Sequence, residues 1–386
     1  MRFNPPPNWP PVPAGWEPAP GWQPDPEWPP VPQDWPLWID DHLSHPASSP
    51  RSRLRAVSIV AVVVVVMAAA VAWFAVRATS PDTGDHPAVR GTMTLTGTVP
   101  VELNPTSLAL SRDGSLLLVA NNTAATLSVI DPARLQSLRT VAVPGDYQSD
   151  VVFDDSSGLA YLPSYGGSHV SVVDPRRGAV VDRISVGAKP GALALSADGK
   201  LLFVLETVDD RVAIIDLSTR RILDRIAISG SPDTLAQSPD GRTLYVQTWE
   251  SASTIAIIDV PTRRVTRSLP AGPNASAIAI TPRGDELLVA NVYQNTVSII
   301  DPDDGRMITP IPVPKGPIHI AVSPDGGTAY VSTQGDALIS IDIAARRIAG
   351  TLAVDGAPSG LQVSPDGRTL YVTRSTDKSV AVVSLT

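Results

Sequence analysis

The pattern of apolar positions separates the last three quarters of the chain from the rest. From Gly91 onward, short runs alternate apolar and polar residues, as in Thr296–Ile300 and Arg225–Ser229. Alternation with a period of two is typical of strands that bury one face. No stretch of this part shows the period of an amphipathic helix. The pattern therefore predicts an all-β domain.

The predicted strands recur with a fixed period, which takes precedence over local propensity. An apolar pair in the second strand of each unit returns every 41–43 residues. Its copies are Leu118-Val119, Tyr161-Leu162, Phe203-Val204, Tyr245-Val246, Leu288-Val289, Tyr330-Val331 and Tyr371-Val372. An aspartate that follows Ile or Val keeps the same period, at Asp131, Asp174, Asp216, Asp259, Asp301 and Asp342. Two independent markers therefore share one period, and the seven copies of the apolar pair indicate seven repeated units.

Each unit reads as four short strands. The first two are joined by Ser238-Pro239-Asp240-Gly241 or a copy of it, with the residue preferences of a type I turn. Four strands in one unit of this length predict a blade of a β-propeller, and seven units predict seven blades. The last unit stops after its third strand, and residues 92–101 fit the missing fourth. We therefore expect an amino-terminal strand to close the ring and remove its free edges.

These motifs carry a family resemblance over residues 92–386. The period, the Ser-Pro-Asp-Gly turn and the strand end Tyr371-Val372-Thr373-Arg374 resemble YVTN-type seven-bladed propellers. Some copies depart from the pattern, such as Leu288-Val289-Ala290-Asn291 and the altered turn of residues 154–158. The resemblance implies the fold. It implies no single activity, because the family includes lactonase-like enzymes, surface proteins and interaction scaffolds.

An uncharged run of 21 residues, 56–76, precedes the repeats. As a helix it would extend about 31 Å, which is enough to cross a bilayer. The arginines before it predict a cytoplasmic amino terminus and an extracytoplasmic propeller. A cleaved secretory signal is the alternative, although such signals have shorter leaders and apolar cores. The predicted organisation is a tail (1–50), a membrane helix with flanking arginines (51–77), a linker (78–91) and the propeller (92–386).

The tail holds sixteen of the 39 prolines and six of the eight tryptophans. Proline at this density prevents helices and sheets from propagating, so we expect a disordered segment with polyproline II character. It is either a solvated tail or a tryptophan-bearing ligand for a cytoplasmic partner. The segment resembles the Pro/Trp-rich heads of actinobacterial membrane proteins, which implies a lineage more than a function.

Composition narrows the candidate functions. The chain has no cysteine, which excludes disulfides, thiolate catalysis and cysteine-ligated metals. A net charge of −8 without a basic stripe argues against a nucleic-acid partner. We expect no cofactor and no metal site. The aspartate-rich segment 301–305 lacks the ligand spacing of a calcium loop. We also expect the propeller to be a monomer.

Comparison among the repeats singles out candidate site residues. At the start of the innermost strands one column reads Ser107, Asp150, Ala192, Thr234, Ala277, His319 and Gly360, so Asp150 and His319 stand out. The loops between second and third strands differ from copy to copy and lie at the same end of the ring. Function on a scaffold concentrates in such variable loops. The predicted binding residues at this end are Asp150, Tyr165, His169, Glu206, Trp249, Glu250, Tyr293, His319 and Arg374.

These residues favour a binding module for an unidentified protein or envelope ligand. A lactonase-like hydrolase is the alternative, and it would need His319, a carboxylate such as Glu206 or Asp150, and Arg374 to converge. A purely structural envelope component is a third possibility. Asp150 and His319 belong to units two and six, so we expect the ring to hold them too far apart for a direct hydrogen bond. We therefore assign no catalytic residue.

Overall fold

The computed structural model describes residues 2–3, 38–39, 92–145, 149–249 and 252–386. The chain divides into two compact units, Met1–His86 and Pro87–Thr386. In the first unit, the described residues form β1 (Arg2–Phe3) and β2 (Trp38–Ile39), which pair antiparallel. The predicted membrane run and linker lie outside the described residues. Among the residues that are described, no helix has the length and apolar character needed to cross a bilayer.

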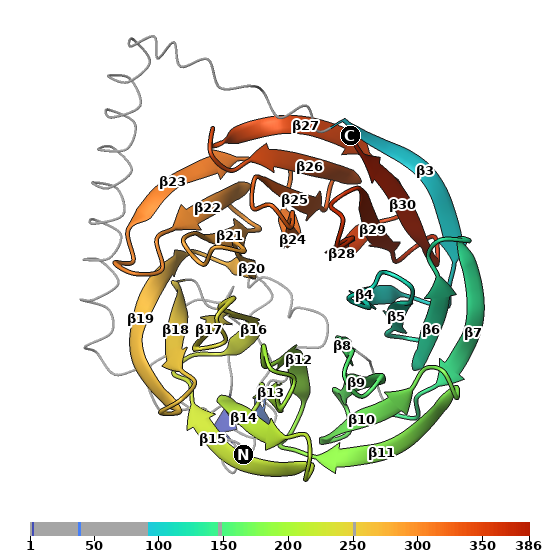
Figure 1. Ribbon diagram of the computed structural model, residues 1–386. Coiled ribbons are helices and arrows are strands. Elements are labelled where there is room, and N and C mark those ends of the chain that lie inside the picture. The colour runs from blue at the N-terminus through green and yellow to red at the C-terminus, as the bar shows by residue number, and fades with distance from the viewer. Residues whose placement is uncertain (1, 4–37, 40–91, 146–148, 250–251) are drawn as a thin grey trace, which may run out of the picture. The chain divides into compact units, whose positions relative to one another are not determined.

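The second unit is a closed ring of seven four-stranded antiparallel sheets (Figure 1). This confirms the propeller that the repeat predicted. Blade one contains β4 (Pro105–Leu110), β5 (Leu117–Asn121), β6 (Thr126–Asp131) and β7 (Gln136–Ala142). Blade two contains β8 (Val152–Asp154), β9 (Leu159–Ser164), β10 (His169–Asp174) and β11 (Ala179–Ser185). Blade three contains β12 (Pro190–Leu195), β13 (Leu201–Glu206), β14 (Arg211–Asp216) and β15 (Arg221–Ala227).

In every blade the first strand stands nearest the axis and the fourth lies on the rim (Figure 1). Blade four contains β16 (Pro232–Gln237), β17 (Thr243–Thr248), β18 (Ser253–Asp259) and β19 (Arg264–Gly272). Blade five contains β20 (Ala275–Ile280), β21 (Leu287–Asn291), β22 (Thr296–Ile300) and β23 (Met307–Pro312). Blade six contains β24 (Pro317–Val322), β25 (Thr328–Thr333), β26 (Ala337–Asp342) and β27 (Arg347–Ala353).

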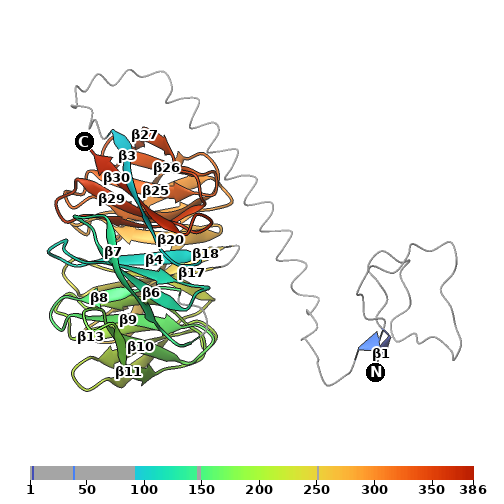
Figure 2. The same ribbon diagram turned by 90° about the vertical axis from the view of Figure 1, so that its right-hand side faces the viewer.

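Blade seven joins the two ends of the propeller. It contains β28 (Pro358–Val363), β29 (Thr369–Arg374) and β30 (Ser379–Leu385), and its outer strand is β3 (Met93–Pro100). Seven residue pairs link β3 to β30, from Met93 opposite Leu385 to Pro100 opposite Ser379. In the side view, β3 runs beside β30 at the rim (Figure 2). The predicted closing strand is therefore confirmed.

The apolar core is a ring of seven clusters, one between each pair of neighbouring blades. Middle strands are covered on both faces, so they read as continuous apolar runs; all five residues of β5 are buried. Outer strands face solvent, and six of the seven residues of β7 are exposed. This packing explains why the sequence mixes continuous runs with alternating ones.

The Ser-Pro-Asp-Gly segments form the tight turns that their sequence predicted. In blade four, the amide of Gly241 donates to the carbonyl of Ser238 at 2.9 Å. The hydroxyl of Ser238 donates to Asp240 at 2.6 Å and accepts from the amide of Thr243 at 2.9 Å. Gly241 has a φ of +73°, which favours glycine at this position. The repeated aspartates of these turns therefore serve local structure.

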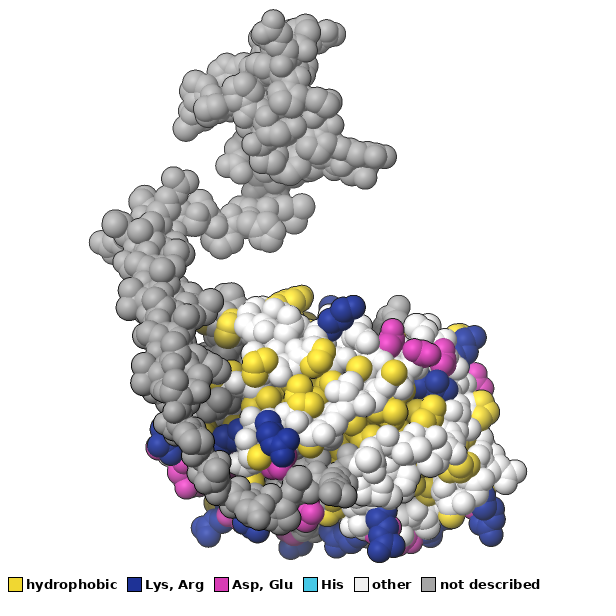
Figure 3. Space-filling model, turned by 90° about the horizontal axis from the view of Figure 1, so that it is seen from above, with side chains coloured by type: hydrophobic (Ala, Val, Ile, Leu, Met, Phe, Trp, Pro, Cys, Tyr) yellow, Lys and Arg dark blue, Asp and Glu magenta, His cyan; other side chains and the backbone are white. Residues whose placement is uncertain are grey.

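The rim carries few charges on one side of the ring. Among the strands β23, β27 and β3, Arg347 is the one charged residue. Figure 3, seen from the side of β27, shows small apolar patches among uncharged groups and a few charged side chains. Leu95 and Met307 are among the exposed apolar side chains of these outer strands. Scattered apolar residues of this kind are ordinary on a protein surface and do not by themselves mark a binding site.

Candidate functional site

A cavity of about 500 Å³ lies at one end of the propeller axis. It opens where the first strands begin and the loops between second and third strands gather, which is the end that varies most between repeats. Six of the seven blades contribute to its lining. The lining residues are Ser107, Ser149, Asp150, Tyr165, Gly191, Ala192, Thr207, Val208, Ser231, Pro232, Asp233, Thr234, Trp249, Ser276 and His319.

Irregular strand starts aim side chains into this cavity. In blade four, Pro232 pairs with Thr248 and Thr234 pairs with Gln247, so the register skips Asp233. The same shift occurs in blade five around Ser276 and in blade six just before His319. A proline is tolerated at a strand start because the position needs no amide donor, and a bulge redirects the next side chain. The repeated bulge therefore places a ring of variable residues around the axis.

Asp150 enters the cavity from blade two and is held in place by three donors. Its Oδ1 accepts hydrogen bonds from the hydroxyl of Ser107 at 2.7 Å and from the backbone amide of Val151 at 2.8 Å. Its Oδ2 accepts the amide of Leu193 at 2.9 Å. Burial raises the pKa of Asp150, and this effect outweighs the hydrogen bonds, which lower it. The carboxyl group thus links blades one, two and three.

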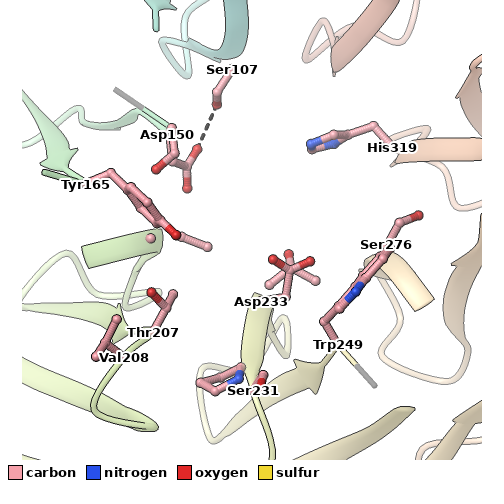
Figure 4. A pocket seen from close by; sticks show the side chains of 15 residues that line it. Ser107, Asp150, Tyr165, Thr207, Val208, Ser231, Asp233, Trp249, Ser276 and His319 are labelled. Atoms are coloured by element: carbon pink, nitrogen blue, oxygen red, sulfur yellow. Dashed lines mark hydrogen bonds between the residues drawn. The ribbon is translucent and has the colours of Figure 1, made fainter. Parts of the chain in front are cut away.

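Asp233 projects into the cavity from the bulge of β16 (Figure 4). Among the described residues it has no hydrogen bond or ion pair. Its side chain is open to the cavity, yet the surrounding walls desolvate it and raise the pKa of the carboxyl group. Asp233 is not among the residues that the sequence pattern predicted. It stands out only in the column one residue earlier than that of Asp150 and His319, which reads Thr106, Ser149, Gly191, Asp233, Ser276, Ile318 and Ser359.

His319 faces the cavity from blade six, across from Asp150 (Figure 4). No hydrogen bond joins the two side chains within the described structure, in agreement with their predicted separation. Desolvation by the surrounding walls lowers the pKa of His319, so the imidazole is neutral at pH 7. Neither a charge-relay pair nor a metal site follows from this placement. Groups of three or more potential metal ligands are absent from the described residues.

Aromatic side chains stand where the cavity opens. Tyr165 and Trp249 line it, and both are more than a third exposed, at 37% and 38%. Trp249 makes an edge-to-face contact with Tyr293, with ring centroids 6.3 Å apart and planes at 68°. The Nζ of Lys189 lies 5.3 Å from the centroid of the Tyr165 ring. Exposed aromatic groups at a cavity entrance favour binding, because they can bury large apolar areas.

The other predicted site residues lie outside the cavity lining. Glu206 is fully buried, where its Oε2 and Oε1 accept from Arg225 Nε at 2.9 and 3.1 Å, and Oε1 also accepts the amide of Gly187 at 2.7 Å. Arg374 pairs with Asp377 at 2.9 Å, and the ring of His169 contacts the carbonyl of Gly167. Glu250 is outside the described residues.

This distribution separates the predicted residues into two groups. Asp150, Tyr165, Trp249 and His319 share one cavity, and Tyr293 contacts Trp249 beside it. The three groups that a lactonase-like site would need are not assembled: His319 and the carboxyl group of Asp150 line the cavity, but Arg374 lies outside its lining and pairs with Asp377. The cavity as observed can therefore hold a ligand between carboxylates, hydroxyls and aromatic rings.

Replacing Asp233 by Asn is expected to stabilise the protein at pH 7. The folded state raises the pKa of this carboxyl above its ordinary value of 3.8, so the folded state binds the proton more tightly than the unfolded state does. The cost of ionisation is absent below pH 3.8 and complete above the raised pKa. The Asp233→Asn variant should therefore melt at a higher temperature than the unaltered protein at pH 7, and the two melting temperatures should converge at lower pH. A less stable Asp233→Asn variant at pH 7 would reveal a favourable partner for the carboxylate.

Comparisons with known proteins support the fold. No protein-family model matches the chain. Over 98 residues it is 31% identical to the uncharacterized protein YncE of Salmonella typhimurium, a stretch that covers 25% of this chain and 27% of that protein. Hydrazine synthase of Kuenenia stuttgartiensis has a similar structure, with a TM-score of 0.68 and 21% identity over 74% of this chain and 97% of that one. At this identity, the likeness to hydrazine synthase shows the fold alone.

Proposed function

We propose that the protein is a membrane-anchored binding module whose ligand or partner occupies the variable mouth of the propeller. The observation that carries this proposal is a cavity of about 500 Å³ with Tyr165 and Trp249 at its opening. Cavities of roughly this size accommodate small ligands, and Tyr and Trp dominate many binding energies. The opposite end supports the choice of face, since it repeats nearly the same turn around the ring. Repeated surfaces discriminate poorly between partners.

Removing the aromatic pair should weaken binding. For the double substitution Trp249→Ala with Tyr293→Ala, we expect a loss of about 2 kcal/mol or more in binding free energy. The matched control is Asp240→Asn with Asp325→Asn in turns at the opposite end, which keeps a hydrogen-bond acceptor in each turn. Capture from an envelope extract with the full-length protein and both variants provides the measurement. Loss of the captured partner in the turn variant, with retention in the aromatic variant, would place the site on the other face.

Anchoring belongs to the same proposal. It is supported by the uncharged run of 21 residues and the arginines before it. Protease added to intact cells should remove the propeller and leave an amino-terminal fragment in the membrane. A mature protein cleaved near Ala78 and released into the medium would instead indicate a secretory signal. With an anchor, the Pro/Trp-rich tail would face the cytoplasm, where it could bind a separate partner.

Membership of the YVTN-type family is also proposed. The period, the turn motif and the strand ends support it, together with the short match to YncE. Within such a family the scaffold is shared and the mouth varies, so the cavity residues of this chain determine what it binds.

A further inference from the structure

We infer that the central cavity binds a small organic cation, whose ammonium group lies between the carboxylates of Asp233 and Asp150 and beneath the rings of Tyr165 and Trp249. This inference rests on the proposed function and adds to it the chemical class of the ligand.

The charge of the lining is the first argument. Two of the fifteen lining residues are aspartates, and none is lysine or arginine. His319 is neutral at pH 7 and so supplies no compensating charge. Burial raises the pKa of both aspartates, so an anionic ligand would oppose their ionisation, whereas a cation favours it. A cation would meet opposite charge where the walls weaken screening by water.

The hydrogen-bonding state of the carboxylates is the second argument. Asp233 has no partner among the described residues, so both of its oxygens can accept from a ligand. Asp150 is already oriented by Ser107, Val151 and Leu193, and its Oδ2 has accepted only one of these bonds. The nearby hydroxyl of Ser149 also has no partner in the described structure. The site therefore retains unused polar groups on one side of the cavity.

The aromatic rings are the third argument. The Nζ of Lys189 lies 5.3 Å from the centre of the Tyr165 ring, so this ring already attracts a cation, and an ammonium ligand would join or displace that lysine. The contact with Tyr293 orients the ring of Trp249 at the opening. Ammonium groups are attracted to aromatic faces within about 6 Å, most strongly to tryptophan. Carboxylates combined with aromatic rings recognise an ammonium group through both its charge and its alkyl substituents.

Two other ligand classes satisfy fewer of these groups. A neutral sugar could use the hydroxyls and the rings, but it would leave the two carboxylates without compensating charge. A metal ion would need more ligands than the described residues bring together. The organic cation is the class that uses the carboxylates and the rings together.

Isothermal titration calorimetry on the full-length protein tests this inference with charged and uncharged probes of matched shape. One pair is choline and the alcohol in which carbon replaces its quaternary nitrogen. A second pair is putrescine and butanediol, and glucose represents neutral sugars. We expect one or both ammonium probes to bind, their uncharged counterparts to bind at least about tenfold more weakly, and added salt to reduce the affinity.

The matched variants are Asp233→Asn and Asp210→Asn. Asp210 lies exposed in the loop between β13 and β14, outside the cavity lining. We expect Asp233→Asn to lower the affinity for the ammonium probe by about tenfold or more, because it removes a charge-assisted contact. We expect Asp210→Asn to leave this affinity unchanged.

Four results would overturn the inference, and the first three concern relative affinities. These are equal binding of the uncharged probes, preference for glucose, or unchanged affinity in the Asp233→Asn variant. Absence of binding by every probe would overturn it as well. In each case the proposed function is judged separately, by whether the Trp249 and Tyr293 substitutions abolish capture of a partner.

Discussion

A chain that begins at Pro105 is expected to aggregate and to melt roughly 10 °C or more below a chain that begins at residue 92. Without β3, blade seven keeps three strands and exposes the edge of β30, which otherwise pairs with seven residues. The shorter chain also loses Val99, which is 1% exposed and packs in the cluster between blades seven and one. The lost strand pairing and burial together cost several kcal/mol of unfolding free energy. A loss of this size lowers the melting temperature of a large domain by roughly 10 °C.

The chain that begins at residue 92 is the matched control, since it also lacks the tail and the apolar run but retains β3. Light scattering and thermal unfolding measured on both chains separate the effect of closure from that of the preceding residues. Equal solubility and equal melting temperature would mean that β3 contributes little to the closed ring.

Substitution of Arg225 by Leu is expected to cost about 3 kcal/mol in free energy of unfolding. Glu206 is fully buried, and Arg225 is its cationic partner at 2.9 Å. Breaking a buried ion pair from one side leaves a charge without compensation, which typically costs 3–5 kcal/mol. The arginine side chain is 39% exposed, so water partly screens the ion pair and the expected cost lies at the lower end of this range.

The double substitution Glu206→Gln with Arg225→Leu should cost less than Arg225→Leu alone, because no buried carboxylate is left behind. Arg221→Leu, at an exposed arginine of the same strand, is the control, with an expected change within about 0.5 kcal/mol. Urea unfolding of the three variants measures these differences. If Arg225→Leu and Arg221→Leu cost the same, the pair contributes little to stability.

Glu206 illustrates why residue type and position in a repeat are insufficient to assign a site. It is a charged residue at the end of a second strand, where the variable loops begin, so the sequence suggests a place at the mouth. Its orientation depends on Arg225, nineteen residues further along in the fourth strand of the same blade. Arg374 is similarly engaged by Asp377. Such pairings depend on side-chain geometry that a repeat alignment does not contain.

Asp233 illustrates the opposite case. The alignment places Thr234 at the mouth of blade four, and the neighbouring aspartate receives no attention. A bulge after Pro232 turns Asp233 toward the axis. A second column of the alignment, one residue before that of Thr234, contains the signal. The sequence identifies that column as functional only once the bulge is known.

The sequence by itself determined the number of blades, the tight turns and the closing strand. These features depend on local spacing and on a pattern repeated seven times, so each copy reinforces the others. The tertiary structure decided which variable residues share the cavity. Asp150, Asp233, Trp249 and His319 come from three blades and meet only because the closed ring brings the inner strands around one axis. Their directions and their desolvation arise from bulges and walls built by distant segments, and no local pattern encodes these.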